Sequence, residues 1–154
     1  MIFDEAFYRK MATQKWRQQD YKKAAEYYEK VLELSPEDFD IQQHYAQCLV
    51  KLNIGKKAEH LFYENIVKDF HVAESFYELS QLNIELNEPN KAFLFGINYV
   101  ILSDDKDFRE MLEKTFEVTY TNEQKIELEA QLFSTQLLFQ FLFSQGRLEE
   151  ARTY

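Results

Sequence analysis

The sequence predicts an all-α fold, a solenoid of antiparallel helical hairpins. Only three glycines and two prolines interrupt its 154 residues, whereas a sheet protein of this length would need many turn residues. Small residues recur at one fixed interval in two separate series, and apolar residues flank them at helical spacing. These observations favour pairs of helices that follow one another along the chain.

The two series of small residues define the repeat. The first series is Ala12, Ala46 and Ser80, the second is Ala24, Ala58 and Ala92, and one and the same interval separates successive members in both. Two helices can approach closely only where a side chain is short, so each pair of small residues marks a contact between two helices.

Each repeat also contains a break between its two helices. The breaks fall at Gln19-Asp20, at Asn53-Ile54-Gly55 and at Asn87-Glu88-Pro89, where the proline suits a first helical turn. We therefore expect three helical hairpins, at residues 5–38, 39–72 and 73–106.

Residues 5–106 resemble three tandem tetratricopeptide repeats, whose pattern is W-x2-L-G-x2-Y, then A-x3-F, then P, with a period that matches the interval between the small residues. The first copy reads Tyr8-x2-Met11-Ala12, then Ala24-x3-Tyr28, then Pro36. This resemblance implies a right-handed α-solenoid in which the first helix of each hairpin lines a concave, peptide-binding groove.

The sequence departs from the pattern of this family at several positions. Lys15 replaces the aromatic residue that usually closes the first helix, and Phe70 and Asp104 replace the closing proline. Gly96 stands where a large aromatic residue is usual. We expect these changes to weaken the packing of the third copy.

The period of the repeat fails after Asp107. Thr121-x-x-Gln124 resembles a capping box that opens a longer helix, which should run to about Ser144. We interpret residues 107–131 as an inserted or atypical helical segment and residues 132–154 as the start of a further, truncated repeat. We expect the chain to be the N-terminal piece of a longer array, with a shorter natural ending as the alternative.

By repeat position, the resemblance places a set of polar and aromatic side chains in the groove. They are Arg9, Lys10, Thr13, Trp16 and Arg17 from the first copy, Gln43, His44, Gln47 and Lys51 from the second, and Glu74, Tyr77, Glu78 and Gln81 from the third. The charge of such a groove would change from basic at the first copy to acidic at the third. This gradient would orient a charged ligand, because a ligand bound in the opposite direction would place like charges together. The alternative is that these helices carry only solvated charge.

Two details refine this prediction. Trp16 is the only tryptophan, and it is either an aromatic anchor in the groove or a core residue. Glu74 and Glu78 occupy positions that are basic in the repeat domains that bind the acidic C-terminus of heat-shock chaperones. Two carboxylates would repel a terminal carboxylate, so we expect no chaperone-tail clamp.

The charge pattern limits the kind of partner. The net charge of −9 argues against nucleic acid and against an acidic membrane surface, and almost all the excess acid lies after residue 72. There is no apolar leader and no apolar run long enough to cross a bilayer. The single cysteine, Cys48, cannot form an internal disulfide. We expect a cytoplasmic protein.

We expect no enzyme, no metal site and no cofactor. His44, His60 and His71 fall in different helices or near a loop, without cysteine or carboxylate neighbours at ligand spacing. Cys48 has no general base at a suggestive spacing and fits a small buried thiol. No glycine-rich phosphate loop or nucleophile elbow is present.

The segment 137–143 is apolar around most of a helix and must be covered on nearly all sides. Its residues Leu138, Phe139, Leu142 and Phe143 are candidates for self-association, and a homodimer is one expected state.

The leading functional hypothesis is a scaffold or adaptor, a protein-binding module that holds a peptide segment of a partner in a rigid groove. The alternative is a self-associating structural protein whose apolar C-terminal helix forms the main interface. Nucleic-acid binding through the basic first repeat is a third and weaker hypothesis.

Overall fold

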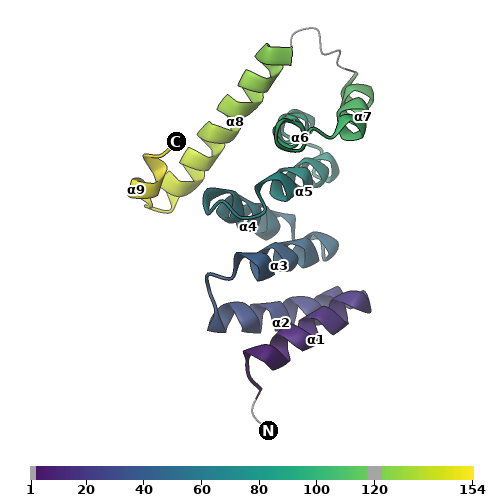
Figure 1. Cartoon of the computed structure of the whole chain (residues 1–154), viewed down its shortest axis with the longest axis vertical. Coiled ribbons are helices and arrows are strands. Elements are labelled where there is room, and N and C mark those ends of the chain that lie inside the picture. Colours follow the sequence, from purple (N-terminus) through teal and green to yellow (C-terminus); the bar gives the residue numbers. More distant parts are fainter. Residues whose placement is uncertain (1–2, 118–122) are drawn as a thin grey trace. The chain divides into compact units, whose positions relative to one another are not determined.

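The computed structural model describes residues 3–117 and 123–154, and these residues are helical with no strand (Figure 1). The predicted all-α class is confirmed. The helices are α1 (Glu5–Arg17), α2 (Tyr21–Leu34), α3 (Phe39–Lys51), α4 (Gly55–Val67), α5 (Val72–Glu85), α6 (Pro89–Ser103), α7 (Lys106–Phe116), α8 (Glu123–Ser144) and α9 (Leu148–Ala151). Within the described ranges, no helix is both long and apolar enough to span a membrane.

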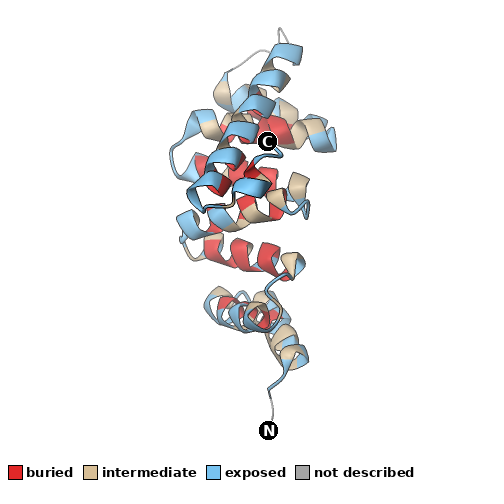
Figure 2. Cartoon of the chain, turned by 90° about the vertical axis from the view of Figure 1, so that its left-hand side faces the viewer, coloured by how far each residue is buried: buried red, intermediate tan, exposed pale blue. Residues whose placement is uncertain are grey.

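The chain divides into two compact units, Met1–His71 and Val72–Tyr154. In the first unit, α1 packs against α2, α2 against α3, and α3 against α4. In the second unit, α5 packs against α6, α6 contacts both α7 and α8, and α9 packs against α8. Within each unit, buried and exposed residues lie on different sides of the helices (Figure 2).

All six small residues of the predicted repeat are fully buried. They are Ala12 and Ala24 in the first hairpin, Ala46 and Ala58 in the second, and Ser80 and Ala92 in the third, each 0% exposed. The serine is satisfied at this depth, because its Oγ donates a hydrogen bond of 2.8 Å to the carbonyl of Ala92.

The turns of the three hairpins share one backbone geometry. Gln19, Asn53 and Asn87 occupy the same place in successive repeats and all have positive φ, at 59°, 61° and 58°. The next residue in each turn donates its N–H to the carbonyl five positions back, over 2.9, 2.9 and 2.8 Å. This bond caps the end of the first helix in the manner of a Schellman motif.

The turn before α9 has the same geometry. Gly146 has a φ of 72°, and the N–H of Arg147 donates to the carbonyl of Leu142 over 3.0 Å. Ala151 is 2% exposed, as its counterpart Ala24 is buried in the first hairpin. The boundary that we expected at residues 131/132 lies inside α8, which is continuous from Glu123 to Ser144. The expected capping residue Thr121 lies outside the described residues.

Gly96 explains how α7 fits into the second unit. A Cβ at this position would lie 2.8 Å from both methyl carbons of Leu112 in α7 and 3.0 Å from the Oγ of Ser80 in α5. Leu112 is 0% exposed. The side chain of the inserted helix therefore fills the place where the repeat pattern has a large aromatic residue.

We predict that Gly96→Leu lowers the free energy of unfolding by about 1–3 kcal/mol, although leucine favours helix over glycine. The reason is the overlap with Leu112, whose side chain is fully buried. Urea unfolding followed by circular dichroism measures this loss. The double variant Gly96→Leu/Leu112→Ala should recover part of it, and strictly additive losses would contradict the proposed contact.

Candidate functional site

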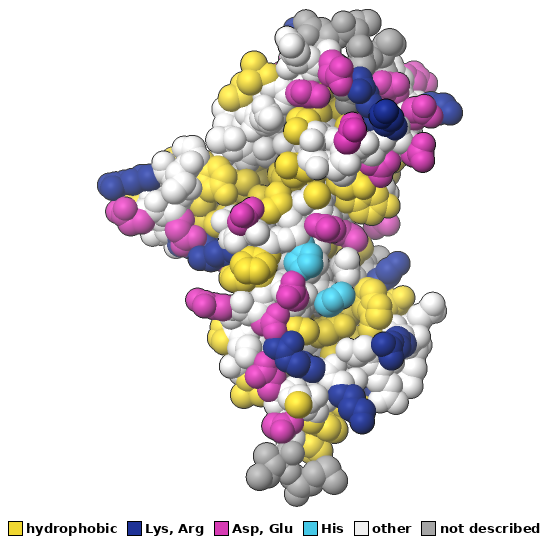
Figure 3. Space-filling view, viewed as in Figure 1, with side chains coloured by type: hydrophobic (Ala, Val, Ile, Leu, Met, Phe, Trp, Pro, Cys, Tyr) yellow, Lys and Arg dark blue, Asp and Glu magenta, His cyan; other side chains and the backbone are white. Residues whose placement is uncertain are grey.

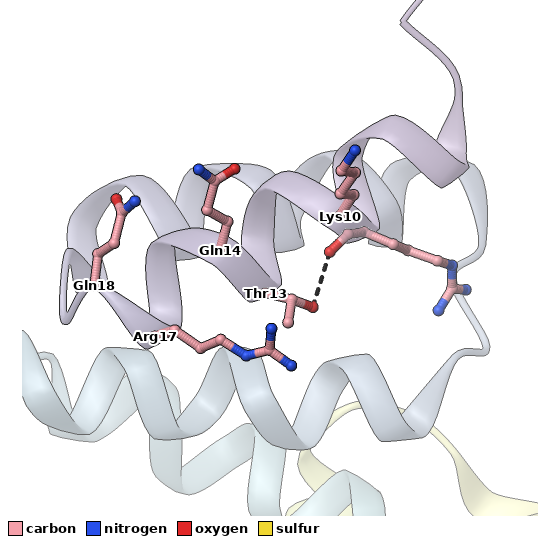
Figure 4. Close-up of a pocket in the computed structure, with 6 residues that line it drawn as sticks. Lys10, Thr13, Gln14, Arg17 and Gln18 are labelled. Carbon is pink, nitrogen blue, oxygen red and sulfur yellow. Dashed lines mark hydrogen bonds between the residues drawn. The ribbon is translucent and has the colours of Figure 1, made fainter.

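The exposed side of α1 forms an open hollow of about 770 Å³ in the first unit. Its lining residues come from successive turns of this one helix, and they are Arg9, Lys10, Thr13, Gln14, Arg17 and Gln18 (Figure 4). Four of the thirteen predicted groove residues are among them. The hydroxyl of Thr13 donates to the carbonyl of Arg9 over 3.0 Å.

Arg9 is engaged by two carboxylates of its own unit. Its guanidinium lies 2.6 Å from Oε1 of Glu5, and it also hydrogen bonds to Asp38. Glu5 accepts a further bond of 2.8 Å from Ser35. Asp38 is the N-cap of α3 and accepts the N–H of Ile41. Arg9 therefore ties α1 to the loop between α2 and α3, and its charge is largely neutralised.

This network changes the pKa of both acids. Hydrogen bonds from Arg9 and then from Ser35 lower the pKa of Glu5. Burial opposes the ionisation of Asp38, but hydrogen bonds from Arg9 and from the backbone N–H of Ile41 outweigh it and lower the pKa of Asp38. Both carboxylates therefore stabilise the folded unit at neutral pH.

A cluster of aromatic rings joins α1, α2 and α3. The ring of Trp16 meets that of Tyr21 edge-on, with 5.3 Å between centroids, and lies 6.2 Å from the ring of His44. The His44 ring also stacks on Tyr28 at 5.9 Å. Trp16 is half-buried and His44 is exposed. The sequence left open whether Trp16 is a core residue or an exposed aromatic anchor. In the structure one part of its side chain packs against other rings and another part faces solvent.

The helix next to the exposed side of α1 is α3. The prediction that its residue Gln43 lies in the groove is wrong. Gln43 is only 4% exposed, because its Oε1 accepts a bond of 2.7 Å from Asn65 in α4. Asn65 in turn accepts a bond of 2.9 Å from Gln42. The amide of Gln43 belongs to this buried network between α3 and α4 and not to a ligand surface.

The remaining residues of α3 do face solvent. His44 and Lys51 are exposed and Gln47 is half-buried. They stand three and four positions apart, which places them on one side of the helix. The contact between the rings of Trp16 and His44 brings this side next to the exposed side of α1. Figure 3 shows basic side chains and histidine rings together with acidic and hydrophobic ones on the face of the first unit that is turned to the viewer.

Three cations on this face are available to a ligand. Lys10, Arg17 and Lys51 are exposed, and none of them forms an ion pair with any residue in the described ranges. This distinguishes them from Arg9. We define the six residues Lys10, Thr13, Trp16, Arg17, His44 and Lys51 as the basic face.

The predicted groove residues of the third copy lie on α5 in the second unit. Glu74 and Tyr77 are exposed, and Glu78 and Gln81 are half-buried. The ring of Tyr77 lies 5.2 Å from that of Tyr99 and 5.3 Å from that of Phe108, between centroids. The hydroxyl of Tyr99 donates to Asp105 over 2.9 Å, and this bond raises the pKa of Tyr99. α5 therefore presents carboxylates beside a packed aromatic cluster.

The residues predicted for self-association divide into two groups. Leu138 and Leu142 are 4% and 0% exposed, because they lie on the side of α8 that packs inside the second unit. Their assignment to a free surface was wrong. Phe139 and Phe143 are exposed, and so are Leu128 and Leu132, which sequence reasoning missed although their spacing places them on the same side of the helix.

Cys48 is the single cysteine of the chain, and it is fully buried. Burial raises the pKa of the Cys48 thiol to about 12, which favours the protonated thiol at neutral pH. Among residues 3–117 and 123–154, no three His, Cys, Asp or Glu side chains are grouped so that they could hold a metal ion.

Comparisons with known proteins agree with the repeat architecture. Residues 15–62 match the family described as tetratricopeptide repeat. Among solved structures, one titled "Crystal structure of MamA protein" is similar, with a TM-score of 0.63 and 18% sequence identity over 100% of this chain and 89% of that one. No curated protein sequence matches. The predicted resemblance and the predicted solenoid of helical hairpins are confirmed.

We predict that Arg9→Met lowers the free energy of unfolding at neutral pH by about 0.5–1 kcal/mol, a small value because solvent screens the 39%-exposed arginine. The pKa values of Glu5 and Asp38 are lowered by folding, so their contribution is present above the unfolded values near pH 4 and lost below them. The difference from the wild type should therefore shrink between about pH 5 and about pH 3.

Urea titrations at several pH values measure this difference. The neighbouring variant Lys10→Met is the control, since Lys10 is exposed and should not alter stability. An equal loss for Arg9→Met at acid and neutral pH would show that packing, and not the ion pair, is responsible.

Proposed function

We propose that this chain of tetratricopeptide repeats is a protein-binding module of the scaffold or adaptor kind, and that the basic face of its first unit binds an acidic peptide segment of a partner protein. The observation that supports the proposal is the set of three exposed cations, Lys10, Arg17 and Lys51, beside the exposed part of Trp16. Tetratricopeptide repeats in general mediate protein–protein interaction.

The chemistry of the basic face suits an extended acidic peptide. Lys10 and Arg17 lie about two turns apart on α1 and can meet carboxylates spaced along a chain, and Thr13 adds a hydroxyl between them (Figure 4). Trp16 and His44 offer ring surface to one apolar side chain of the peptide. Because the helices are fixed by buried contacts, we expect binding with little conformational change.

The basic face contrasts with the charge of the whole protein. The first unit carries eleven basic and twelve acidic side chains, whereas the second carries seven and fifteen. An acidic ligand is therefore disfavoured by most of the surface and favoured at the few places where cations are exposed without partners. α5, which presents Glu74 and Glu78, would by the same reasoning favour a basic segment.

A library of short peptides sorted by net charge tests the proposal. We expect the wild type to select acidic peptides that contain an aromatic residue, with binding that weakens as salt rises, because exposed charges are screened. The charge reversal Lys10→Glu/Arg17→Glu/Lys51→Glu should weaken binding about tenfold or more.

The matched control is Lys22→Glu/Lys23→Glu/Lys56→Glu, which makes the same change in net charge at exposed positions on α2 and α4. This control should retain the selection of acidic peptides. If the control loses binding as much as the first variant does, net charge and not the basic face determines it, and the proposal fails. Selection of basic peptides by the wild type would also contradict it.

A further inference from the structure

The outer side of α8 carries a row of large apolar side chains in contact with solvent. Leu128, Leu132, Phe139 and Phe143 are 56%, 55%, 40% and 59% exposed. They follow one another along the helix at intervals of four, seven and four positions, which keeps them on one side of it. The opposite side, with Ala130 among others, is buried inside the second unit. We call these four residues the α8 stripe.

Leu132, Phe139 and Phe143 lie in a segment without charge, whereas Leu128 stands between Glu127 and Glu129. From Ala130 to Gly146 there is no acidic or basic side chain, although the second unit as a whole carries fifteen acidic and seven basic groups. Exposed helices of soluble proteins normally carry charge on their outer side. An uncharged side is the part of an acidic protein through which a second copy can approach without like-charge repulsion.

The spacing of the stripe is symmetric about its centre. Leu128 and Phe143 lie at equal distances along the chain from the midpoint between Thr135 and Gln136, and so do Leu132 and Phe139. Two antiparallel copies of α8 related by a two-fold axis at this midpoint would therefore set a leucine against a phenylalanine at every apolar contact. An isologous dimer requires this kind of self-complementarity.

We propose that the partner of the α8 stripe is the α8 stripe of a second copy, packed antiparallel about a two-fold axis at Thr135 and Gln136. A hollow of about 330 Å³ at the midpoint, lined by Thr135, Gln136, Phe139, Gln140 and Tyr154, receives side chains of the partner.

The size of the stripe sets the strength of this dimer. Four partly exposed leucine and phenylalanine side chains offer on the order of 400 Å² of apolar surface per copy. A stable specific interface buries about 800 Å² per partner, so the α8 pair belongs to the weak, reversible class with a dissociation constant in the micromolar range. This inference is independent of the proposed function, which rests on the other unit.

Sedimentation equilibrium of the whole chain tests the dimer and its register. We expect the wild type to dimerise reversibly. In Leu132→Glu/Phe139→Glu, carboxylates face each other across the axis, and the dissociation constant should rise about tenfold or more. In Leu132→Glu/Phe139→Lys, each glutamate faces a lysine of the other copy, so dimerisation should return. A parallel pair would instead place like charges together in this second variant.

Disulfide trapping tests the same register in a different way. Thr135→Cys lies beside the axis and should cross-link to its own copy. The Leu132→Cys and Phe139→Cys chains should each fail to cross-link alone, because the two positions lie about 10 Å apart along the helix, but an equal mixture of them should cross-link. The native Cys48 is fully buried and does not interfere.

Three results would overturn the proposal. One is a monomeric wild type at about 100 μM, far above a micromolar dissociation constant. Another is a dimer that the Leu132→Glu/Phe139→Glu variant leaves intact. The third is cross-linking of Leu132→Cys with itself as efficient as that of the mixture. All substituted side chains are exposed, and circular dichroism of each variant confirms that it is folded.

Discussion

The burial of one pair of small side chains in each hairpin is the constraint on which the rest of the structure depends. Ala12 with Ala24, Ala46 with Ala58, and Ser80 with Ala92 have no exposed surface. A larger side chain at any of these positions would separate two helices and expose the apolar residues around them. The pairs also decide which side of each first helix faces inward, and so which side is left for the cations of the basic face.

The three hairpins could be predicted because their signal is local and repeated. One common period fixes both the small residues and the turns, where Gln19, Asn53 and Asn87 adopt the same left-handed conformation. The place of α7 could not be predicted in this way. Gly96 looks like a defect in the repeat pattern, and only the contact with Leu112 shows that another helix fills the space.

The candidate site was predicted in part. Repeat position predicted that Lys10, Arg17 and Lys51 are exposed, but it could not show that Arg9 is neutralised by Glu5 and by Asp38 from the next loop. Gln43 was assigned to the surface because the sequence does not reveal its hydrogen bond with Asn65 of α4. Asn65 donates to Gln43 and accepts a hydrogen bond from Gln42. Such errors arise wherever a side chain finds its partner in a helix distant along the chain.

The central claim is that the basic face of the first unit holds an acidic peptide. The most direct test is a nuclear magnetic resonance titration of the isotopically labelled chain with a short peptide containing aspartates and one aromatic residue. We expect the amide resonances that shift to belong to α1 and α3, between Lys10 and Arg17 and between His44 and Lys51. Shifts confined to α2 and α4, or spread evenly over both units, would contradict it.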